Sequence, residues 1–258
     1  MVIETIPPAL GFGYALIVFF LLVWLWSIGK FTRKIGFIFL VISTALGFLL
    51  FSPVAPYQLQ LLILMEFAAL GVPVQMIFFG LCFFIGFTIL FGRIFCGHIC
   101  PIGTLQELLF LIPLPKYKRN LKSAAKIVRI LMFILILVAG IVFSVNILGL
   151  LGVKDFFYLN VAGFSFFVFS ILVILALIIY RPFCRFICPY GFFLSLATIP
   201  GLFQIARTDL CINCGKCEQN CPTDEAKQND NKAECYMCGR CMEICPVRGA
   251  LVYQRRNR

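Results

Sequence analysis

The sequence has little charge and almost no histidine. Only 13% of its 258 residues are Asp, Glu, Lys or Arg, about half the share of an ordinary soluble domain. With 62% hydrophobic residues, this excludes a soluble globular protein of the usual kind. His98 is the only histidine, and a bis-histidine haem needs two. The sequence therefore excludes a haem b quinol oxidase of the di-haem type.

Long apolar runs take the place of the missing charge. Five of them are long enough to cross a bilayer as helices: residues 12–28, 35–51, 72–91, 127–151 and 161–180. A sixth apolar segment, residues 59–70, is short and contains Glu66, so we expect it to lie flat at the membrane surface. The expected fold is mainly α: a polytopic membrane bundle of about five spans with a small C-terminal α+β domain.

The formal charge of +11 raises the possibility of nucleic acid, but its placement argues for a membrane. Lys and Arg cluster beside the ends of alternate apolar runs, where Lys154 is the one basic residue in the intervening connections. Basic loops stay on the cytoplasmic side. We therefore expect an inner-membrane protein with its N-terminus outside, its C-terminus in the cytoplasm, and no nucleic-acid partner.

The chain divides into three expected parts. Residues 1–34 form an additional N-terminal span, residues 35–206 a membrane domain, and residues 207–258 a cytoplasmic domain in which apolar runs end and charges alternate in sign. A domain of about fifty residues needs metals or disulfides to supplement its core. Metal is favoured here, because the cysteines are too closely spaced for comfortable disulfide pairing.

Two tandem cysteine runs lie in this last part. CINCGKCEQNCP begins at Cys211 and CYMCGRCMEICP at Cys235. Both have the C-x2-C-x2-C-x3-C-P spacing of two-cluster ferredoxins, in which the fourth cysteine ligates the other cluster. A zinc site is the disfavoured alternative, because it takes four ligands in two pairs. The expected [4Fe–4S] ligands are Cys211, Cys214, Cys217 and Cys245 for one cluster and Cys221, Cys235, Cys238 and Cys241 for the other. The thirteen residues between Cys221 and Cys235 leave room for a short strand or none.

The membrane domain contains an internal repeat. Residues 93–103 read RIFCGHICPIG and residues 181–191 read RPFCRFICPYG. Both copies follow runs of the same orientation, which predicts a parallel repeat about an axis along the membrane normal. The paired cysteines are four apart and would share a helix face. We expect Cys96, Cys100, Cys184 and Cys188 to meet and hold a further Fe–S cluster or a soft metal such as Cu(I). The alternative is that they pack a tight helix end beneath the soluble domain.

Three further residues have ordinary alternatives. Cys82 stands alone within an apolar run, where a packed small side chain is the favoured interpretation. His98 and Glu66 are weak candidates for a quinone-linked or proton-transfer role, since ionisable groups at membrane depth are often functional. Otherwise His98 makes an interfacial hydrogen bond and Glu66 is solvated. No catalytic residue is otherwise indicated.

These motifs resemble those of NapH/MauN-type membrane ferredoxins and are similar to the C-terminal part of NosR-type proteins. The resemblance covers about residues 35–252 and implies a quinol dehydrogenase component or electron conduit, with quinone and other redox subunits as partners. Copper-handling assembly proteins resembling CcoG share the motifs, so a copper-binding and copper-reducing role is the alternative. A docking scaffold is a third hypothesis. The lack of Met-rich or His-rich stretches weakens the copper hypothesis, and eight intact cluster ligands weaken the scaffold.

Overall fold

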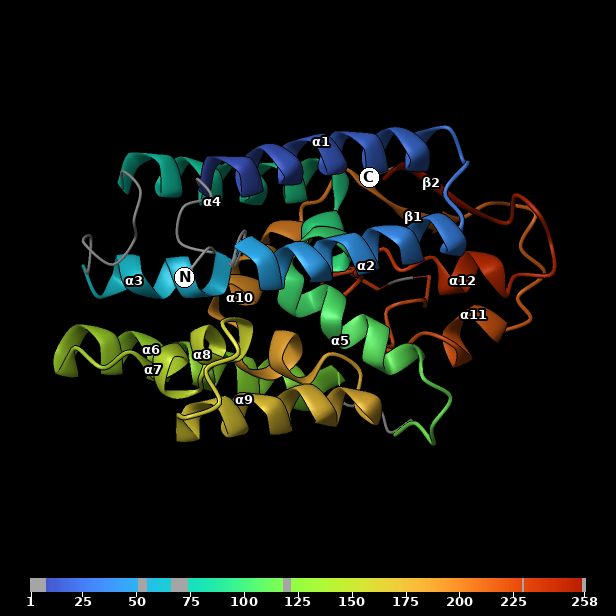
Figure 1. Ribbon diagram of the computed structural model, residues 1–258. Helices are drawn as coiled ribbons and strands as arrows, with labels where there is room; N and C mark the ends of the chain where they lie inside the picture. The colour runs from blue at the N-terminus through green and yellow to red at the C-terminus, as the bar shows by residue number, and fades with distance from the viewer. Residues whose placement is uncertain (1–7, 51–54, 66–73, 118–121, 229, 257–258) are drawn as a thin grey trace.

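The computed structural model describes residues 8–50, 55–65, 74–117, 122–228 and 230–256, and it is mainly helical with one small sheet (Figure 1). This confirms the expected fold class. The helices are α1 (Pro8–Ser27), α2 (Arg33–Leu50), α3 (Ala55–Ile63), α4 (Val74–Phe91), η3 (Phe95–Ile99), α5 (Pro101–Leu111), α6 (Lys122–Phe143), α7 (Ile147–Leu150), α8 (Val153–Phe157), α9 (Phe164–Ile174), η4 (Leu175–Leu177), η5 (Phe183–Ile187), α10 (Pro189–Thr198), α11 (Lys216–Gln219) and α12 (Arg240–Glu243). The strands are β1 (Phe203–Arg207) and β2 (Leu251–Arg255).

Helices long and apolar enough to cross a membrane form the body of the structure. They cover Leu10–Ser27, Arg33–Leu50 and Lys122–Phe143, while Ile77–Phe91 and Phe164–Leu177 are apolar but shorter. They run lengthwise in Figure 1, and the sheet lies at one end. Large apolar side chains are exposed on the outer faces of these helices. A helix that is hydrophobic all round needs apolar surroundings, such as a protein core or a membrane. The arrangement fits a membrane-embedded bundle.

Two spans are shorter than the sequence predicted. The expected helix over 127–151 ends at Phe143, and the Asn146 side chain starts the separate helix α7 by accepting a hydrogen bond from Gly149 N at 2.7 Å. Such a side-chain cap favours a new helix start over a continuous helix. The expected span over 161–180 is helical from Phe164 and tightens into a 3-10 turn at Leu175–Leu177.

Helix α3 contains the start of the segment that we expected to lie flat. Instead it packs against α4, α6 and α10 and runs lengthwise beside them (Figure 1). Its buried Gln60 explains this placement, because the side-chain Oε1 accepts a hydrogen bond from Leu148 N of α7 at 2.8 Å. A polar group inside the bundle fixes the helix there. Glu66 lies outside the described residues.

The small C-terminal domain is closed by two antiparallel strands, one before and one after the two cysteine runs. Phe203 pairs with Arg255 and Arg207 with Leu251. Among the described residues between the cysteine runs there is no strand, which agrees with the short inter-motif connection. The sheet also includes residues 203–206, which lie before the boundary expected at residue 207.

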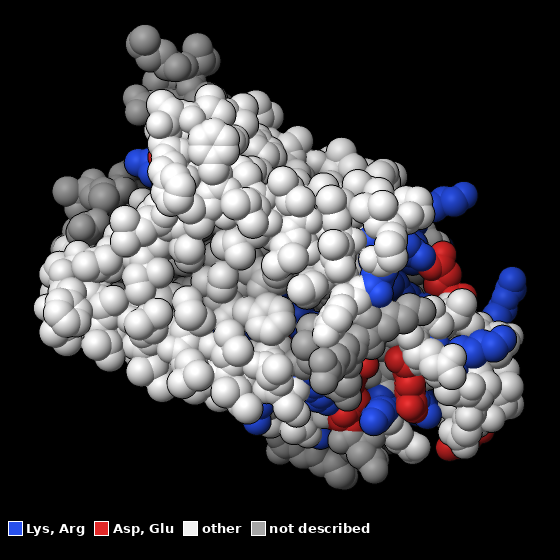
Figure 2. Space-filling view, turned by 90° about the horizontal axis from the view of Figure 1, so that it is seen from below, with Lys and Arg blue, Asp and Glu red and all other residues white. Residues whose placement is uncertain are grey.

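Aromatic contacts join this domain to the bundle. The Tyr253 hydroxyl donates to Phe91 O at 3.0 Å, and the rings of Phe91 and Phe203 stack with centroids 5.9 Å apart. The ring centroid of Trp26 in α1 lies 5.8 Å from that of Tyr253. Lys, Arg, Asp and Glu gather at this end of the molecule, whereas most of the visible face beside it has neither sign of charge (Figure 2). The C-terminal domain is therefore packed at the charged end of an otherwise apolar body.

Candidate iron–sulfur site

The two ferredoxin loops repeat the same unusual backbone. Asn213 and Gly215 have φ of 52° and 71°, and the equivalent Met237 and Gly239 have 55° and 76°. Left-handed residues between right-handed ones turn successive N–H groups inward, which creates a concavity suited to anions and Fe–S sites. Both loops are therefore shaped to hydrogen-bond a negatively charged group between their cysteines.

Each expected ligand set lines its own cavity. Cys211, Cys214, Cys217 and Cys245 line a small pocket of about 20 Å³. Cys221, Cys235, Cys238 and Cys241 line a different pocket of about 130 Å³. In both cases the fourth cysteine comes from the other run, which is the exchange that two-cluster ferredoxins use. The grouping of the eight thiols fits two cubane clusters.

Both copies of the membrane repeat have the same backbone conformation. The first cysteine lies in a π-helical turn, and the second, Cys100 or Cys188, precedes the proline that begins α5 or α10. The two N-cap cysteines have nearly equal φ and ψ, −64° and 119° against −60° and 113°. In each copy one thiol therefore projects from a π turn and the other from an extended N-cap residue. The sequence predicted that both would project from one face of an α-helix. Such π turns are frequent at functional sites.

The glycine of the repeat is required by close packing. A Cβ atom on Gly103 would lie 2.5 Å from Cys96 O, and one on Gly191 would lie 3.1 Å from Cys184 O. The chain therefore returns across the first cysteine of its own motif, and any side chain at the glycine would push the motif apart. This explains why both copies share C-P-x-G.

The four repeat cysteines are buried and lie near one another. Burial raises the pKa of the Cys184 thiol well above its usual range, and the charges of Cys188, Cys100 and Cys96 add to that rise. Within the described residues, no three His, Cys, Asp or Glu side chains are close enough to hold one metal ion. The thiolates of a cubane bind four separate irons and stand further apart than the ligands of a single ion.

The first residue of each repeat is an arginine that binds the other copy. Arg93 Nη2 donates to Gly191 O at 3.4 Å in the second copy. Arg181 donates to Gly97 O at 2.9 Å and to Cys96 O in the first copy. Both guanidinium groups are fully buried. The two halves of the membrane domain are thus tied together by reciprocal charge-assisted hydrogen bonds.

The same two arginines also contact Tyr236 of the second ferredoxin loop. The guanidinium carbons of Arg93 and Arg181 lie 4.5 and 4.7 Å from the centre of its ring. A Cβ atom on Gly97 would lie 2.2 Å from Tyr236 O. The loop between Cys235 and Cys238 is therefore inserted where the two repeat copies meet.

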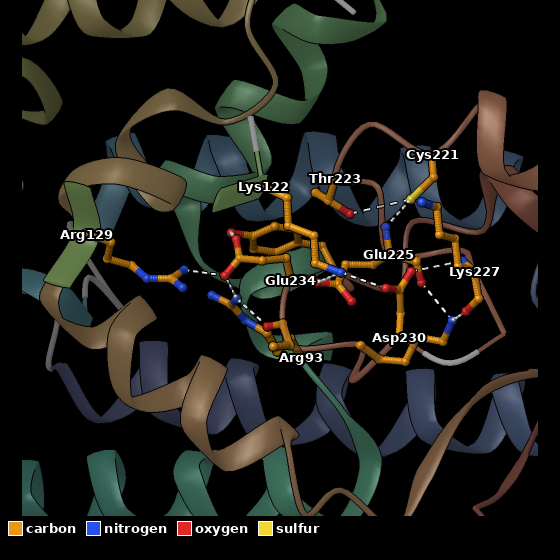
Figure 3. A network of polar contacts seen from close by, with 12 residues as sticks. Arg93, Lys122, Arg129, Cys221, Thr223, Glu225, Lys227, Asp230 and Glu234 are labelled. Carbon is orange, nitrogen blue, oxygen red and sulfur yellow. Dashed lines mark hydrogen bonds and ion pairs between the residues drawn. The ribbon is translucent and has the colours of Figure 1, made fainter. Parts of the chain in front are cut away.

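Two buried carboxylates balance these arginines. Glu234 pairs with Arg93 at 3.3 Å and with Arg129 of α6, as Figure 3 shows. Glu107 of α5 pairs with Arg181 at 2.9 Å and with Arg240 at 2.5 Å. Burial alone would raise the pKa of the Glu107 carboxyl, but the two arginines outweigh burial and hold the pKa below its usual range. Each carboxylate links the membrane part to the ferredoxin domain.

A second set of ion pairs lies beside Glu234. Lys122, at the start of α6, reaches Asp230 at 2.7 Å and Glu225 at 3.2 Å in the connection between the cysteine runs (Figure 3). The backbone N–H of Glu225 donates to Cys221 Sγ at 3.3 Å. The short inter-motif connection is therefore held by charge against α6.

The remaining candidates differ in where they lie. His98 is 3% exposed, and its buried Nδ1 has no protein partner. Burial, with the charge of Arg181, lowers its pKa to about 4, so the imidazole is neutral near pH 7. Cys82 is exposed on α4, so its interpretation as a buried packing residue was wrong. Its side chain faces the surroundings of the bundle.

The residues that join the parts carry weak signals in the sequence. Arg93 and Arg181 resemble loop charges that set orientation, although each opens its copy of the repeat. Their identical place in the two motifs was the available signal. Tyr236 and Glu107 belong to no comparable sequence pattern. A single aromatic or acidic residue is common both at contacts between domains and away from them.

Paired cysteine loops docked on a helical membrane part define the class: this is a ferredoxin-type iron–sulfur protein. Residues 73–122 and 161–203 match the 4Fe-4S binding domain family, and residues 204–246 match the 4Fe-4S dicluster domain family. The first match includes both copies of the repeat. The matches confirm the resemblance to membrane ferredoxins.

Related proteins agree with this class. The chain is 29% identical over 164 residues to YccM, a candidate electron transport protein of Escherichia coli K12, covering 54% of this chain and 44% of the relative. It is 30% identical over 144 residues to an uncharacterized protein of Methanocaldococcus jannaschii, covering 52% of this chain and 60% of that one. The chain thus spans about half the length of these relatives. No solved structure matches significantly.

Proposed function

We propose that this protein carries electrons within a membrane-bound redox complex. It links the quinone pool, or another redox partner in the membrane, to a redox protein that faces the cytoplasm. The observation that carries this proposal is the sorting of eight cysteines into two cavities, each lined by the four thiols of one expected cluster. The match to a dicluster family and the similarity to YccM support electron transfer.

The expected cluster ligands are the two quartets already described. Cys211, Cys214, Cys217 and Cys245 hold one [4Fe–4S] cluster, and Cys221, Cys235, Cys238 and Cys241 hold the other. Such clusters supply one-electron chemistry when bound. The protein's part is to direct backbone N–H groups at the sulfides, to set the second quartet beside the membrane domain, and to leave Cys214 of the first quartet exposed. The route for electrons therefore has one end beside the membrane domain and the other at the exposed Cys214.

A further centre at the repeat cysteines extends the proposal toward the membrane. Cys96, Cys100, Cys184 and Cys188 would hold a further Fe–S cluster at the axis between the two copies, because their thiols stand too far apart for a single metal ion. Tyr236 links this place to the second quartet, since it follows Cys235 directly and its ring packs under Arg93 and Arg181, the first residues of the two repeat copies. The alternative is copper binding for an assembly pathway. It is less well supported, because thiols that are 5–7% exposed are poorly placed to exchange an ion with a partner.

Anaerobic purification with iron and sulfide analysis tests the main proposal. We expect at least about eight irons and eight sulfides, and a reduced form with the EPR spectrum of [4Fe–4S]⁺ clusters. The variant Cys214→Ser should lose one cluster, whereas Cys82→Ser is a matched control and should keep all of them. Stoichiometric zinc in place of iron would overturn the proposal.

A further inference from the structure

A pocket of about 550 Å³ lies where the start of α2 meets the first repeat motif and the second ferredoxin loop. Its lining combines α2, the π turn that contains His98, and the cluster loop at Cys238. The volume is in the range of about 300–1,000 Å³ that small-molecule sites occupy. Three different parts of the fold thus converge on one hollow.

One side of this pocket is apolar and belongs to a helix long enough to cross a membrane. Phe37 and Ile38 of α2 line it and are 49% and 55% exposed. In a bilayer such side chains face hydrocarbon, because exposed apolar surface of this kind is unfavourable in water. A ligand in the pocket can therefore extend an apolar tail directly into the lipid along α2.

The inner side is polar and incompletely satisfied. His98 lines the pocket, and its buried Nδ1 has no protein partner. Leaving such a group unpaired costs about 1–3 kcal/mol, so each one calls for an explanation such as a ligand or water. The ring itself is held in place, because it packs edge-on against Phe31 with centroids 5.3 Å apart. This is a fixed hydrogen-bonding group beside an apolar opening.

The remaining side reaches the electron route and the aqueous edge. Cys238 lines both this pocket and the cavity of the second cysteine quartet. At the rim, Arg33 pairs with Glu243 at 2.5 Å, and both side chains are open to water, at 41% and 55% exposure. A ligand bound here would touch a cluster thiolate on one side and have water close by on another.

The geometry points to this pocket as the binding site for the head group of a membrane quinone. His98 forms a hydrogen bond to a quinone oxygen, and the prenyl tail leaves along Phe37 and Ile38. This inference rests on the proposed function and gives its membrane end a location. A quinol bound there would become the quinone by giving up two electrons, and the two expected clusters would accept one each. Its two protons pass to water at the rim beside Arg33 and Glu243.

Photolabelling of the full-length, cluster-loaded protein in detergent tests the site. The probes are a prenylated azidonaphthoquinone and its azidobenzoquinone counterpart, and the labelled peptides are identified by mass spectrometry. We expect label within residues 33–40 or 97–111, and its loss when unlabelled quinone is added. His98→Phe keeps the ring packing and should weaken labelling about tenfold, the equivalent of one lost hydrogen bond of about 1.4 kcal/mol. His98→Gln should retain most of it.

Thr88→Val is the matched control, because Thr88 is buried and polar but lies outside the pocket. It should label like the unaltered protein, and iron content in every variant shows that the fold is kept. Label that falls elsewhere, that is unchanged in His98→Phe, or that only an anionic phospholipid displaces would overturn the site. In that last case the pocket is a lipid site.

Cluster reduction by a short-chain quinol separates this inference from the proposed function. If quinol reduces the clusters equally well in His98→Phe, the function stands and the pocket assignment is wrong. If the label falls in the pocket but neither quinol class reduces any cluster, the binding site stands. The quinone-linked form of the proposed function then fails.

Discussion

Arg93 and Arg181 hold equivalent positions in the two repeat copies, and both guanidinium groups lie over the ring of Tyr236. Each arginine also donates to a backbone carbonyl of the opposite copy. One aromatic side chain of the ferredoxin domain is thus shared by the two halves of the membrane domain. The contact between the two repeat copies and the attachment of the ferredoxin domain depend on the same residues.

Replacement of Tyr236 tests this shared contact. Tyr236→Leu removes two buried cation–π interactions worth about 1–2 kcal/mol each, and we expect the Tm in detergent to fall by roughly 5–10 °C. Tyr236→Phe keeps the ring and loses only a long hydrogen bond of 3.4 Å to Glu234, so its Tm should stay within a few degrees. Equal Tm values for both variants and the unaltered protein would show that the arginines do not depend on the ring.

Glu107 gives a second test of the same junction. Glu107→Gln leaves Arg181 and Arg240 without their shared counter-charge, and breaking a buried pair costs about 3–5 kcal/mol. We expect a clear drop in unfolding temperature and faster proteolysis near residues 201–207. Glu243→Gln breaks the exposed pair with Arg33 and should cost at most about 1 kcal/mol. A comparable loss in both variants would argue against a special role for Glu107.

Gly97 tests how closely the ferredoxin loop approaches the repeat. Gly97→Ala would place a Cβ atom 2.2 Å from Tyr236 O, so we expect overpacking to destabilise the protein by about 1–3 kcal/mol. Gly86→Ala on α4 meets nothing within 4 Å and should be neutral or slightly stabilising, as alanine is in a helix. Thermal unfolding followed by circular dichroism distinguishes the two. An unaffected Gly97→Ala protein would mean that the loop lies further away.

The repeat cysteines have their own test. Cys96→Ser combined with Cys184→Ser should remove the additional centre while leaving the eight-iron EPR signal of the ferredoxin quartets. Metal analysis and EPR on the double variant, with Cys82→Ser alongside, report this directly. Full metal content together with an unchanged electron-transfer rate would make the four thiols packing residues.

Orientation is tested with reporters. A fusion after Arg258 should be active only as a cytoplasmic reporter, and one near Lys154 only as an external reporter, because basic residues gather at the ferredoxin end. Lys154 lies in α8, which Figure 1 places toward the end of the bundle away from the sheet. A cytoplasmic result at Lys154 would contradict the expected orientation.

Much of this arrangement could be predicted from local sequence. Cysteine spacing predicted which thiols line each of the two cavities, and apolar runs located the helices, since both signals depend on neighbouring residues. The repeat also indicated that Cys96 and Cys184 lie near each other. The end of α6 was missed because Asn146 acts through a side-chain cap, which an averaged apolar run does not reveal.

The contacts between distant parts could not be predicted. Arg93 and Arg181 look like ordinary loop charges until their partners are known, and those partners are backbone carbonyls of another segment. Similarly, Gln60 gave no sign that it would bind a backbone N–H of α7. Residues such as these are recognised only when two elements far apart in the chain are placed side by side.

The insertion of Tyr236 between the repeat copies has a consequence for how the protein is made. Its loop is the segment between Cys235 and Cys238, so the shape of that loop depends on delivery of iron and sulfide to the newly synthesised chain. Until delivery, Arg93 and Arg181 lack their shared aromatic partner. Cofactor insertion and consolidation of the membrane part should therefore occur as one maturation step. Cells starved of iron should degrade the whole chain, membrane helices included.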